Sequence, residues 1–212
     1  MHYEIPLPFR EGNVQLPNNR SQAVQCLHGL KKRLKVTCSI MPSTYFSVIS
    51  EIIEKGYARK VSAKELSPEE GKVWYLSHHR VYHPKKPGSL RVLFDCSAQE
   101  LNDHLLQGSD LSSKITGVLT RFRKERVAFM ADKEKMFFQV TVKKENQNFF
   151  RFMWRSNGHL TQEPQENCMT VHLFDAGSSP GYSKFAVKCT AEDGEREFSA
   201  RTAEALKKNF KR

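Results

Sequence analysis

A single carboxylate, Asp132, ends the apolar stretch VAFMA that begins at Val127. An aromatic residue, Phe137, follows five positions later. An aspartate at the exposed end of a buried strand can hold a divalent metal ion, which activates an attacking oxygen or neutralises a leaving group. Aspartate also commonly ends strands, so two interpretations are open: an ordinary strand end, or one ligand of a metal site.

A second group of candidate residues is cationic and surrounds a short turn. The segment KKPGSLRVLFD places Lys86 in the turn and Arg91 on the strand that follows. The period of two along a strand puts three apolar residues on the face opposite Arg91: Leu90, Val92 and Phe94. An arginine fork binds phosphate oxygens in pairs, so this face can grip a nucleotide. The alternative is a solvated hairpin in which Asp95 pairs with Arg91.

Three histidines in HHRVYH also have the side chains of a metal site: His78, His79 and His83. Imidazoles at close spacing bind zinc or nickel. On a strand, however, His78 faces away from the other two, and no cysteine or carboxylate lies nearby in sequence to complete four ligands. The spacing therefore disfavours a metal here.

The local patterns predict the elements that position these residues. Apolar residues three and four apart predict helices at 21–35, 43–56, 111–122, 179–189 and 199–210, with the apolar side of 111–122 facing the core. Short runs rich in aromatic and β-branched residues predict strands at 73–84, 90–95, 127–131, 141–144, 148–154 and 168–174. The first two of these strands form a predicted hairpin around KKPGS.

The composition limits the class of protein. With 34 Lys and Arg against 23 Asp and Glu, the 212-residue chain carries +11, which favours a nucleic-acid partner bound through phosphates. Its five cysteines are scattered without a CxxC pair, which indicates reduced thiols rather than disulfides or a zinc finger. There is no signal peptide and no apolar run long enough to span a membrane, so we expect an intracellular protein, cytoplasmic or nuclear, without a membrane partner.

Several longer strings, taken together, resemble the reverse transcriptase of BEL/Pao retrotransposon polyproteins. They include HYEIPLPFR, WYLSHHRVYHPKKPGSLRVLFDCSA, GVLTRFRKERVAFMADKEKMFFQV and MTVHLFDAGSSP, and the resemblance covers nearly the whole chain. It implies an α+β chain with an incomplete right-hand polymerase fold, in which helices pack on short antiparallel sheets. The implied parts are an extended lead-in (1–20), fingers (21–106), palm (107–143), a return to the fingers (144–168) and a palm helix region (169–212).

The resemblance also implies roles for single residues. Asp132 matches the first catalytic aspartate, a ligand of Mg²⁺. Phe137 matches the aromatic gate that selects a deoxynucleotide, and Lys86 and Arg91 match the cations that hold its triphosphate. The loop that lies against the template matches three residues here: Phe174, Ser179 and Pro180.

Departures from the family pattern weaken the expectation of catalysis. Lys133 puts a cation beside the expected metal, and Asp175 stands where the family has glycine. No two aspartates are adjacent, and the sequence ends where the family continues into a Tyr-x-Asp-Asp hairpin. We therefore expect a reverse-transcriptase-derived fragment that is inactive alone. The alternatives are a non-catalytic module that binds RNA or DNA, a remnant without a cellular role, and an active RNA-directed DNA polymerase whose missing carboxylates come from a longer product.

Overall fold

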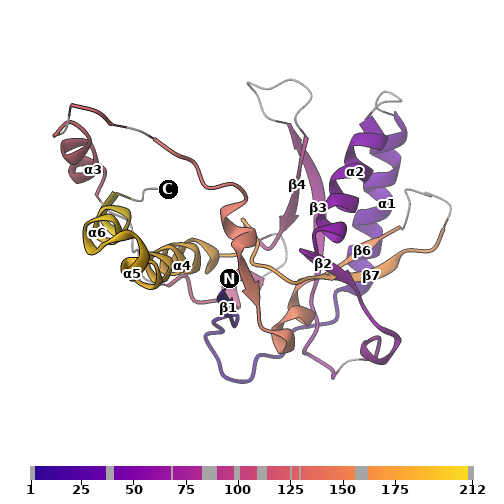
Figure 1. Ribbon diagram of the computed structural model, residues 1–212. Coiled ribbons are helices and arrows are strands. Elements are labelled where there is room, and N and C mark those ends of the chain that lie inside the picture. The colour runs from indigo at the N-terminus through magenta and orange to yellow at the C-terminus, as the bar shows by residue number, and fades with distance from the viewer. Residues whose placement is uncertain are drawn as a thin grey trace.

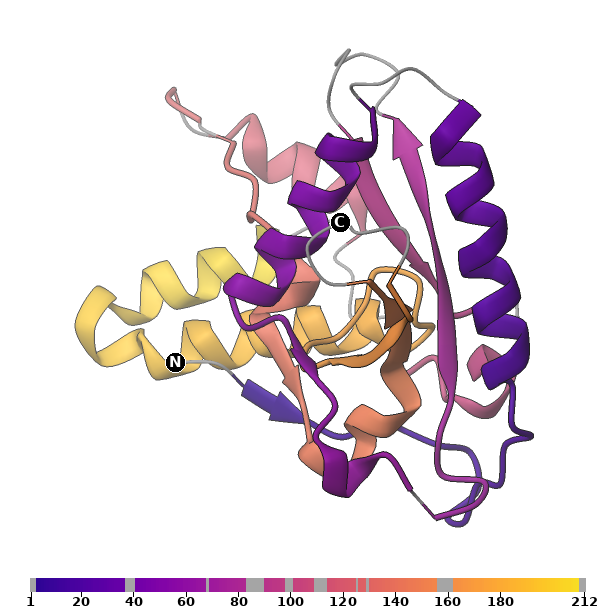
Figure 2. The ribbon, with the colours of Figure 1, turned by 90° about the vertical axis from the view of Figure 1, so that its right-hand side faces the viewer.

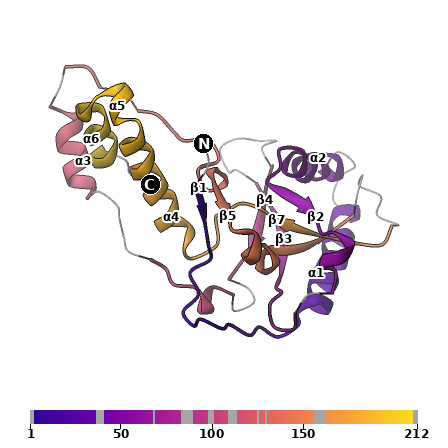
Figure 3. The same cartoon turned by 60° about the horizontal axis from the view of Figure 1, so that its bottom comes forward.

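The protein is an α+β chain, described here by a computed structural model. The structure describes residues 3–36, 41–67, 69–82, 90–97, 101–108, 114–124, 126–128, 130–155 and 162–209. Figure 1 shows a sheet with helices α1 and α2 at one end of the molecule and a group of helices, α3 to α6, at the other. A small second sheet, made of β1 and β5, lies between these two ends (Figure 3).

The larger sheet has five described strands in the order β2-β7-β6-β3-β4. Their bounds are Ala58–Lys60 for β2, Tyr75–Tyr82 for β3, Leu90–Asp95 for β4, Arg151–Trp154 for β6 and Gln165–Met169 for β7. Strands β3 and β6 run parallel, and the other neighbours are antiparallel. The prediction of antiparallel sheets was therefore only partly right, because pairing between β3 and β6 joins segments far apart in the sequence, whose relative direction local patterns do not determine.

The predicted hairpin is confirmed by the pairing of β3 with β4. Its register sets His78 opposite Phe94 and Val81 opposite Arg91. Phe94 is buried, Leu90 and Val92 pack against the same core, and Arg91 is exposed, as the period of two predicted. Residues 83–89, which include Lys86 and His83, lie outside the described residues.

The second sheet pairs the start of the chain with its middle. Strand β1 (Tyr3–Ile5) runs parallel to β5 (Val140–Val142). The predicted lead-in is thus partly a strand, which its prolines did not indicate. Within β5, Thr141 also forms an antiparallel bridge with Val171, so the segment that follows β7 joins this region.

The two long N-terminal helices supply much of the core. Helix α1 (Arg20–Val36) packs on β3 and β6, and helix α2 (Met41–Glu54) packs on β4 and β2 (Figure 2). Both helices were predicted from their apolar spacing, and both bury it: Leu27, Leu30, Ile49 and Ile52 are core residues. Gly56, which follows α2, has φ +73°, the left-handed conformation that ends helices at glycine.

The C-terminal helices form a separate layer. They are α4 (Ser179–Asp193), the short α5 (Glu195–Phe198) and α6 (Ala200–Asn209), and α3 (Ile115–Phe122) packs beside α6. Helix α4 was predicted from its apolar spacing; on it Phe185 is exposed, whereas Ser183, Ala186 and Val187 are buried. No described residue of α3 is buried, so the prediction that its apolar side faces the core was wrong.

The predicted strand at 127–131 is also absent from the described residues of that stretch. These residues have no regular secondary structure, and Val127 and Met130 are 84% and 88% exposed. A strand needs a neighbour for its backbone hydrogen bonds, and none of the described strands pairs with this stretch. Two further findings concern the described residues only: the four described cysteines are free, and no helix is long and apolar enough to cross a membrane.

Candidate functional site

Asp132 lies on an exposed, irregular segment between α3 and the short helix η3 (Met136–Gln139). Among the described residues, no three His, Cys, Asp or Glu side chains are grouped so that they could hold a metal ion. The roles of Asp132 as a catalytic residue and metal ligand stay predictions from the resemblance.

Lys135 fixes the segment that follows Asp132 to helix α2. Its Nζ lies 2.7 Å from Oε1 of Glu51 and 5.5 Å from the ring centre of Tyr57. Hydrogen bonds from Lys135 and Lys55 lower the pKa of Glu51 to about 2. Lys135 itself has φ 49°, an uncommon left-handed conformation for a lysine, which turns the chain into η3. A surface ion pair is worth little alone, but here it joins two segments far apart in sequence.

Two of the predicted site residues are in contact. The rings of Phe137, in η3, and Phe174, in the loop after Leu173, meet edge to face with centres 5.4 Å apart and an interplanar angle of 87°. Phe137 is buried and Phe174 is exposed. Edge-to-face pairs of this kind are attractive because the positive edge of one ring meets the negative face of the other. The structure thus brings together the predicted nucleotide gate and the predicted template loop.

The start of α4 carries buried hydroxyl groups. Ser178, Ser179 and Ser183 are almost fully buried, and none of their hydroxyls has a hydrogen-bond partner among the described residues. Pro180 lies in the first turn of the helix, as predicted, where its missing N–H costs nothing. Ser179 is buried, so among the three predicted template residues Phe174 has the side chain that is most exposed to solvent.

His172 lies beside this helix start and is also incompletely bonded. Its Nε2 is 3.1 Å from the carbonyl oxygen of Ile5, and its ring packs edge-on against Tyr182. Its Nδ1 is buried without a hydrogen-bond partner among the described residues. Burial lowers the pKa of His172 to about 4, so the ring is neutral at physiological pH.

Asp175 connects the Phe174 loop to the end of β4. Its Oδ2 accepts hydrogen bonds from the backbone N–H of Cys96 at 2.9 Å and of Ser97 at 3.2 Å. The side chain of Asn102, in η2 (Leu101–His104), donates to the carbonyl oxygen of Asp175 and accepts from the N–H of Gly177, at 2.9 and 2.8 Å. Sequence reasoning noted Asp175 only as a departure from the family. The structure gives Asp175 a positioning role, because its side chain holds the backbone of Cys96 and Ser97, which directly follow the strand of Arg91.

Arg91 is exposed on β4, which is one of the two outer strands of the described sheet. The neighbouring strand adds Arg80, whose guanidinium lies 5.7 Å from the ring centre of Tyr82. Lys133 is half-buried, and this burial lowers its pKa. A phosphate-binding surface on the hairpin would use the exposed guanidinium of Arg91, because Arg80 is half-buried and lies opposite Val92, on the other face of the sheet.

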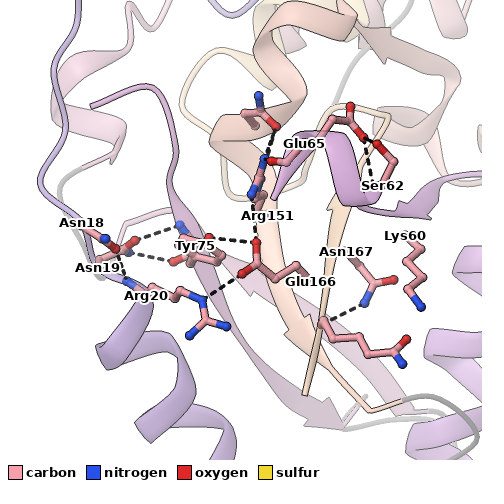
Figure 4. Close-up of polar contacts among 12 residues, drawn as sticks. Asn18, Asn19, Arg20, Lys60, Ser62, Glu65, Tyr75, Arg151, Glu166 and Asn167 are labelled. Atoms are coloured by element: carbon pink, nitrogen blue, oxygen red, sulfur yellow. Dashed lines mark hydrogen bonds and ion pairs between the residues drawn. The ribbon is translucent and has the colours of Figure 1, made fainter. Parts of the chain in front are cut away.

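A buried ionic network, which the sequence analysis missed, joins strands β6 and β7 of the five-stranded sheet (Figure 4). Arg151 on β6 is fully buried, and its Nη1 lies 2.9 Å from Oε2 of Glu166 on β7. Glu166 also accepts from Arg20 Nε at 2.8 Å and from the hydroxyl of Tyr75 at 2.9 Å. Burial acts to raise the pKa of Glu166, but these three donors together lower it below the usual range.

The other side of Arg151 is also fully bonded. Its Nη2 donates to the carbonyl oxygen of Glu65 at 2.6 Å and to Oδ1 of Asn148 at 2.8 Å. The Glu65 carboxylate in turn forms two bonds with Arg59, at 2.7 and 2.8 Å. A signal for this network was present in the sequence: FFRFMW places an arginine inside a strongly apolar strand, and such a charge requires a partner.

His78 belongs to the core rather than to a metal site. Its Nε2 lies 3.0 Å from the carbonyl oxygen of Met153, and its Nδ1 lies 2.5 Å from the hydroxyl of Tyr45. Aromatic rings surround it, among them those of Phe152 and Trp154. Burial lowers the pKa of His78 to about 4. The side chain is therefore a neutral hydrogen-bonding group of the core.

Comparison of the chain with models of known protein families and with curated proteins gave no match. The resemblance to BEL/Pao reverse transcriptases therefore stays a prediction based on the quoted strings.

Proposed function

We propose that this chain is a reverse-transcriptase-like polypeptide of BEL/Pao type that binds RNA or DNA through backbone phosphates and does not polymerise DNA by itself. In this proposal, the five-stranded sheet with α1 and α2 corresponds to the fingers. The β1–β5 sheet and α4 correspond to part of the palm.

The observation that carries the proposal is the contact between Phe137 and Phe174. The resemblance assigns these residues to two different motifs of one site, and the motifs are separated by β5, β6 and β7 in the chain. The Asp175 bonds to Cys96 and Ser97 bring a third motif, the strand of Arg91, to the same loop. Proximity of these three assigned motifs is what the proposal expects, since the resemblance assigns them to one site.

The proposal contains no catalytic step. Nucleotide transfer by this family uses Mg²⁺, and Asp132 would supply one ligand, but the described residues contain no group of three or more His, Cys, Asp or Glu side chains that could hold the ion. What the chain offers is charge and an exposed aromatic ring. A net charge of +11 attracts phosphates without regard to sequence, and the Phe174 ring can stack on a base.

Binding across a salt series tests the proposal. We expect fluorescence anisotropy to show affinity for unrelated labelled RNA and DNA oligonucleotides, with log Kd rising linearly with log salt concentration. Arg91→Ala should weaken binding to all sequences alike and reduce the salt slope by about one. Arg201→Ala, an exposed cation on α6, is the matched control and should have a smaller effect.

Two outcomes would contradict parts of the proposal. Affinity confined to one sequence, or independent of salt, would exclude binding dominated by phosphates. Template-dependent primer extension by the purified chain that disappears in Asp132→Asn would show that the chain is an active polymerase, as in the alternative in which other carboxylates complete the site.

A further inference from the structure

Helix α3 presents an apolar face to solvent. Ile115, Leu119 and Phe122 are 50%, 51% and 42% exposed, and no described residue of the helix is buried. Their spacing of four and then three residues places them on one side of the helix. We call these three residues the α3 face. Large apolar side chains gathered on one exposed side are typical of surfaces that bind another molecule.

The α3 face is held in place rather than loose. Arg121 donates from Nε to Oδ1 of Asn209 at 2.7 Å and from Nη2 to the carbonyl oxygen of Lys208 at 2.5 Å. These bonds attach α3 to the C-terminal end of α6, where a cation is favoured by the helix dipole. The helix therefore offers its apolar side chains from a fixed position, which lowers the entropy cost of docking.

The surroundings of the α3 face are strongly basic. The stretch 114–126 contains five cations and one acid, Glu125: the cations are Lys114, Arg121, Arg123, Lys124 and Arg126. All five cations are exposed. A partner that covers the apolar residues would bring its own flanks against these cations, so acidic flanks would be attracted and basic flanks repelled.

We propose that the α3 face binds an acidic amphipathic helix of a partner protein. The three apolar residues have i, i+4, i+7 spacing, so side chains of another helix can pack between them. The surrounding cations favour a partner with carboxylates at the rim of the interface. Nucleic acid would satisfy the cations but leave the apolar side chains in water. A bilayer fits less well, because the helix has only two turns and Val127 and Ala128, which follow it, have no regular structure to satisfy their backbone in lipid.

The probe for this proposal is a synthetic helical peptide with leucine along one side and glutamate on the other. The control peptide has the same composition with the leucines scattered around the helix. We expect the amphipathic peptide to bind, measured by calorimetry, and the scattered peptide to bind at least tenfold more weakly. Binding should weaken with added salt, because the flanking ion pairs are exposed.

Matched variants locate the binding surface. Leu119→Ser should weaken peptide binding about tenfold, because it removes an apolar anchor from the interface. Leu66→Ser is the control: Leu66 is also 51% exposed but lies after η1 (Ala63–Glu65), in the part of the chain that supports the sheet. It should leave binding unchanged. Because both residues are exposed, both variants should melt close to the parent temperature.

Three results would overturn the proposal: equal binding of the two peptides, an unchanged affinity in Leu119→Ser, or an equal loss in Leu66→Ser. Vesicles of phosphatidylcholine with phosphatidylserine and a labelled oligonucleotide are tested in parallel. If Leu119→Ser abolishes binding to vesicles while the peptide does not bind, the face belongs to a membrane instead. This test does not depend on the proposed nucleic-acid binding, since Arg91 lies on the hairpin and not on α3.

Discussion

Arg151 and Glu166 form an ion pair between adjacent strands in the interior of the sheet, with Nη1 and Oε2 2.9 Å apart and both side chains nearly inaccessible to solvent. Transferring such charges out of water is costly, and the cost is offset only when every remaining donor and acceptor is also bonded. Glu166 accepts further bonds from Arg20 and Tyr75, and Arg151 donates further bonds to Glu65 and Asn148. The pair therefore makes the stability of the sheet sensitive to the loss of any one member.

The first prediction concerns Glu166→Gln. The substitution preserves size but leaves the buried guanidinium of Arg151 without its counter-ion, so the free energy of unfolding should fall by about 3 kcal/mol or more. Glu204→Gln is the control, because the Glu204–Lys208 pair on α6 is exposed to solvent and should contribute little to stability. Urea denaturation of both variants measures the difference. Equal effects would show that the buried pair has no special importance.

The second prediction concerns acid. His78 and His172 have pKa values of about 4 in the folded chain, below the 6.5 of an unperturbed histidine, because burial disfavours their charged forms. The unfolded state therefore binds protons first as the pH falls. Stability should be fully present above pH 6.5 and be lost progressively towards pH 4, by about 3 kcal/mol for each histidine.

Histidine variants separate this effect from general acid denaturation. His78→Gln should reduce stability at neutral pH but flatten its decline between pH 6.5 and 4. His28→Gln, at an exposed position of α1, should leave the curve unchanged. A curve with the same slope in His78→Gln as in the parent would show that His78 is not buried in its neutral form.

The third prediction concerns Asp175→Ala. It removes the acceptor of the Cys96 and Ser97 backbone N–H groups and should lower the free energy of unfolding by about 1–3 kcal/mol. Since these bonds join the strand of Arg91 to the Phe174 loop, nucleic-acid affinity should fall as well. Asp103→Ala, an exposed aspartate in η2, is the control and should change neither quantity.

The fourth prediction concerns the contact between Phe137 and Phe174. A double-mutant cycle with Phe137→Leu and Phe174→Leu should give a coupling energy of about 0.5–1.5 kcal/mol in unfolding experiments. Two variants whose effects simply add would indicate that the rings do not interact in solution. That result would remove the main support for the proposed function.

Local patterns predicted much of this fold because they act over a few residues. The apolar spacing of Leu27 and Leu30, or of Ile49 and Ile52, is buried as expected, and the hairpin around Arg91 has the expected faces. The same reasoning failed at Val127 and Met130, since an apolar run becomes a strand only if another strand lies beside it. Burial there depends on tertiary neighbours and not on the run itself.

The candidate site, like the fold, was predicted from the sequence only in part. Its residue types were read from the sequence, but the meeting of Phe137 with Phe174 depends on contacts between distant segments. The positioning role of Asp175 was hidden because its partners are backbone N–H groups, which every residue except proline carries. Arg151 was the one member of the ionic network that a closer reading of the strand pattern would have found.

The parallel pairing of Tyr3–Ile5 with Val140–Val142 has a consequence for how the protein is made. During synthesis, β1 emerges before its partner strand, which follows only after all the residues between them have been translated. Protein synthesis adds about 5–20 residues per second, so the backbone of β1 stays unpaired for on the order of ten seconds. The N-terminal segment therefore docks late, after the β3–β4 hairpin has had time to form, and a chaperone that shields emerging chains has its longest opportunity to act there.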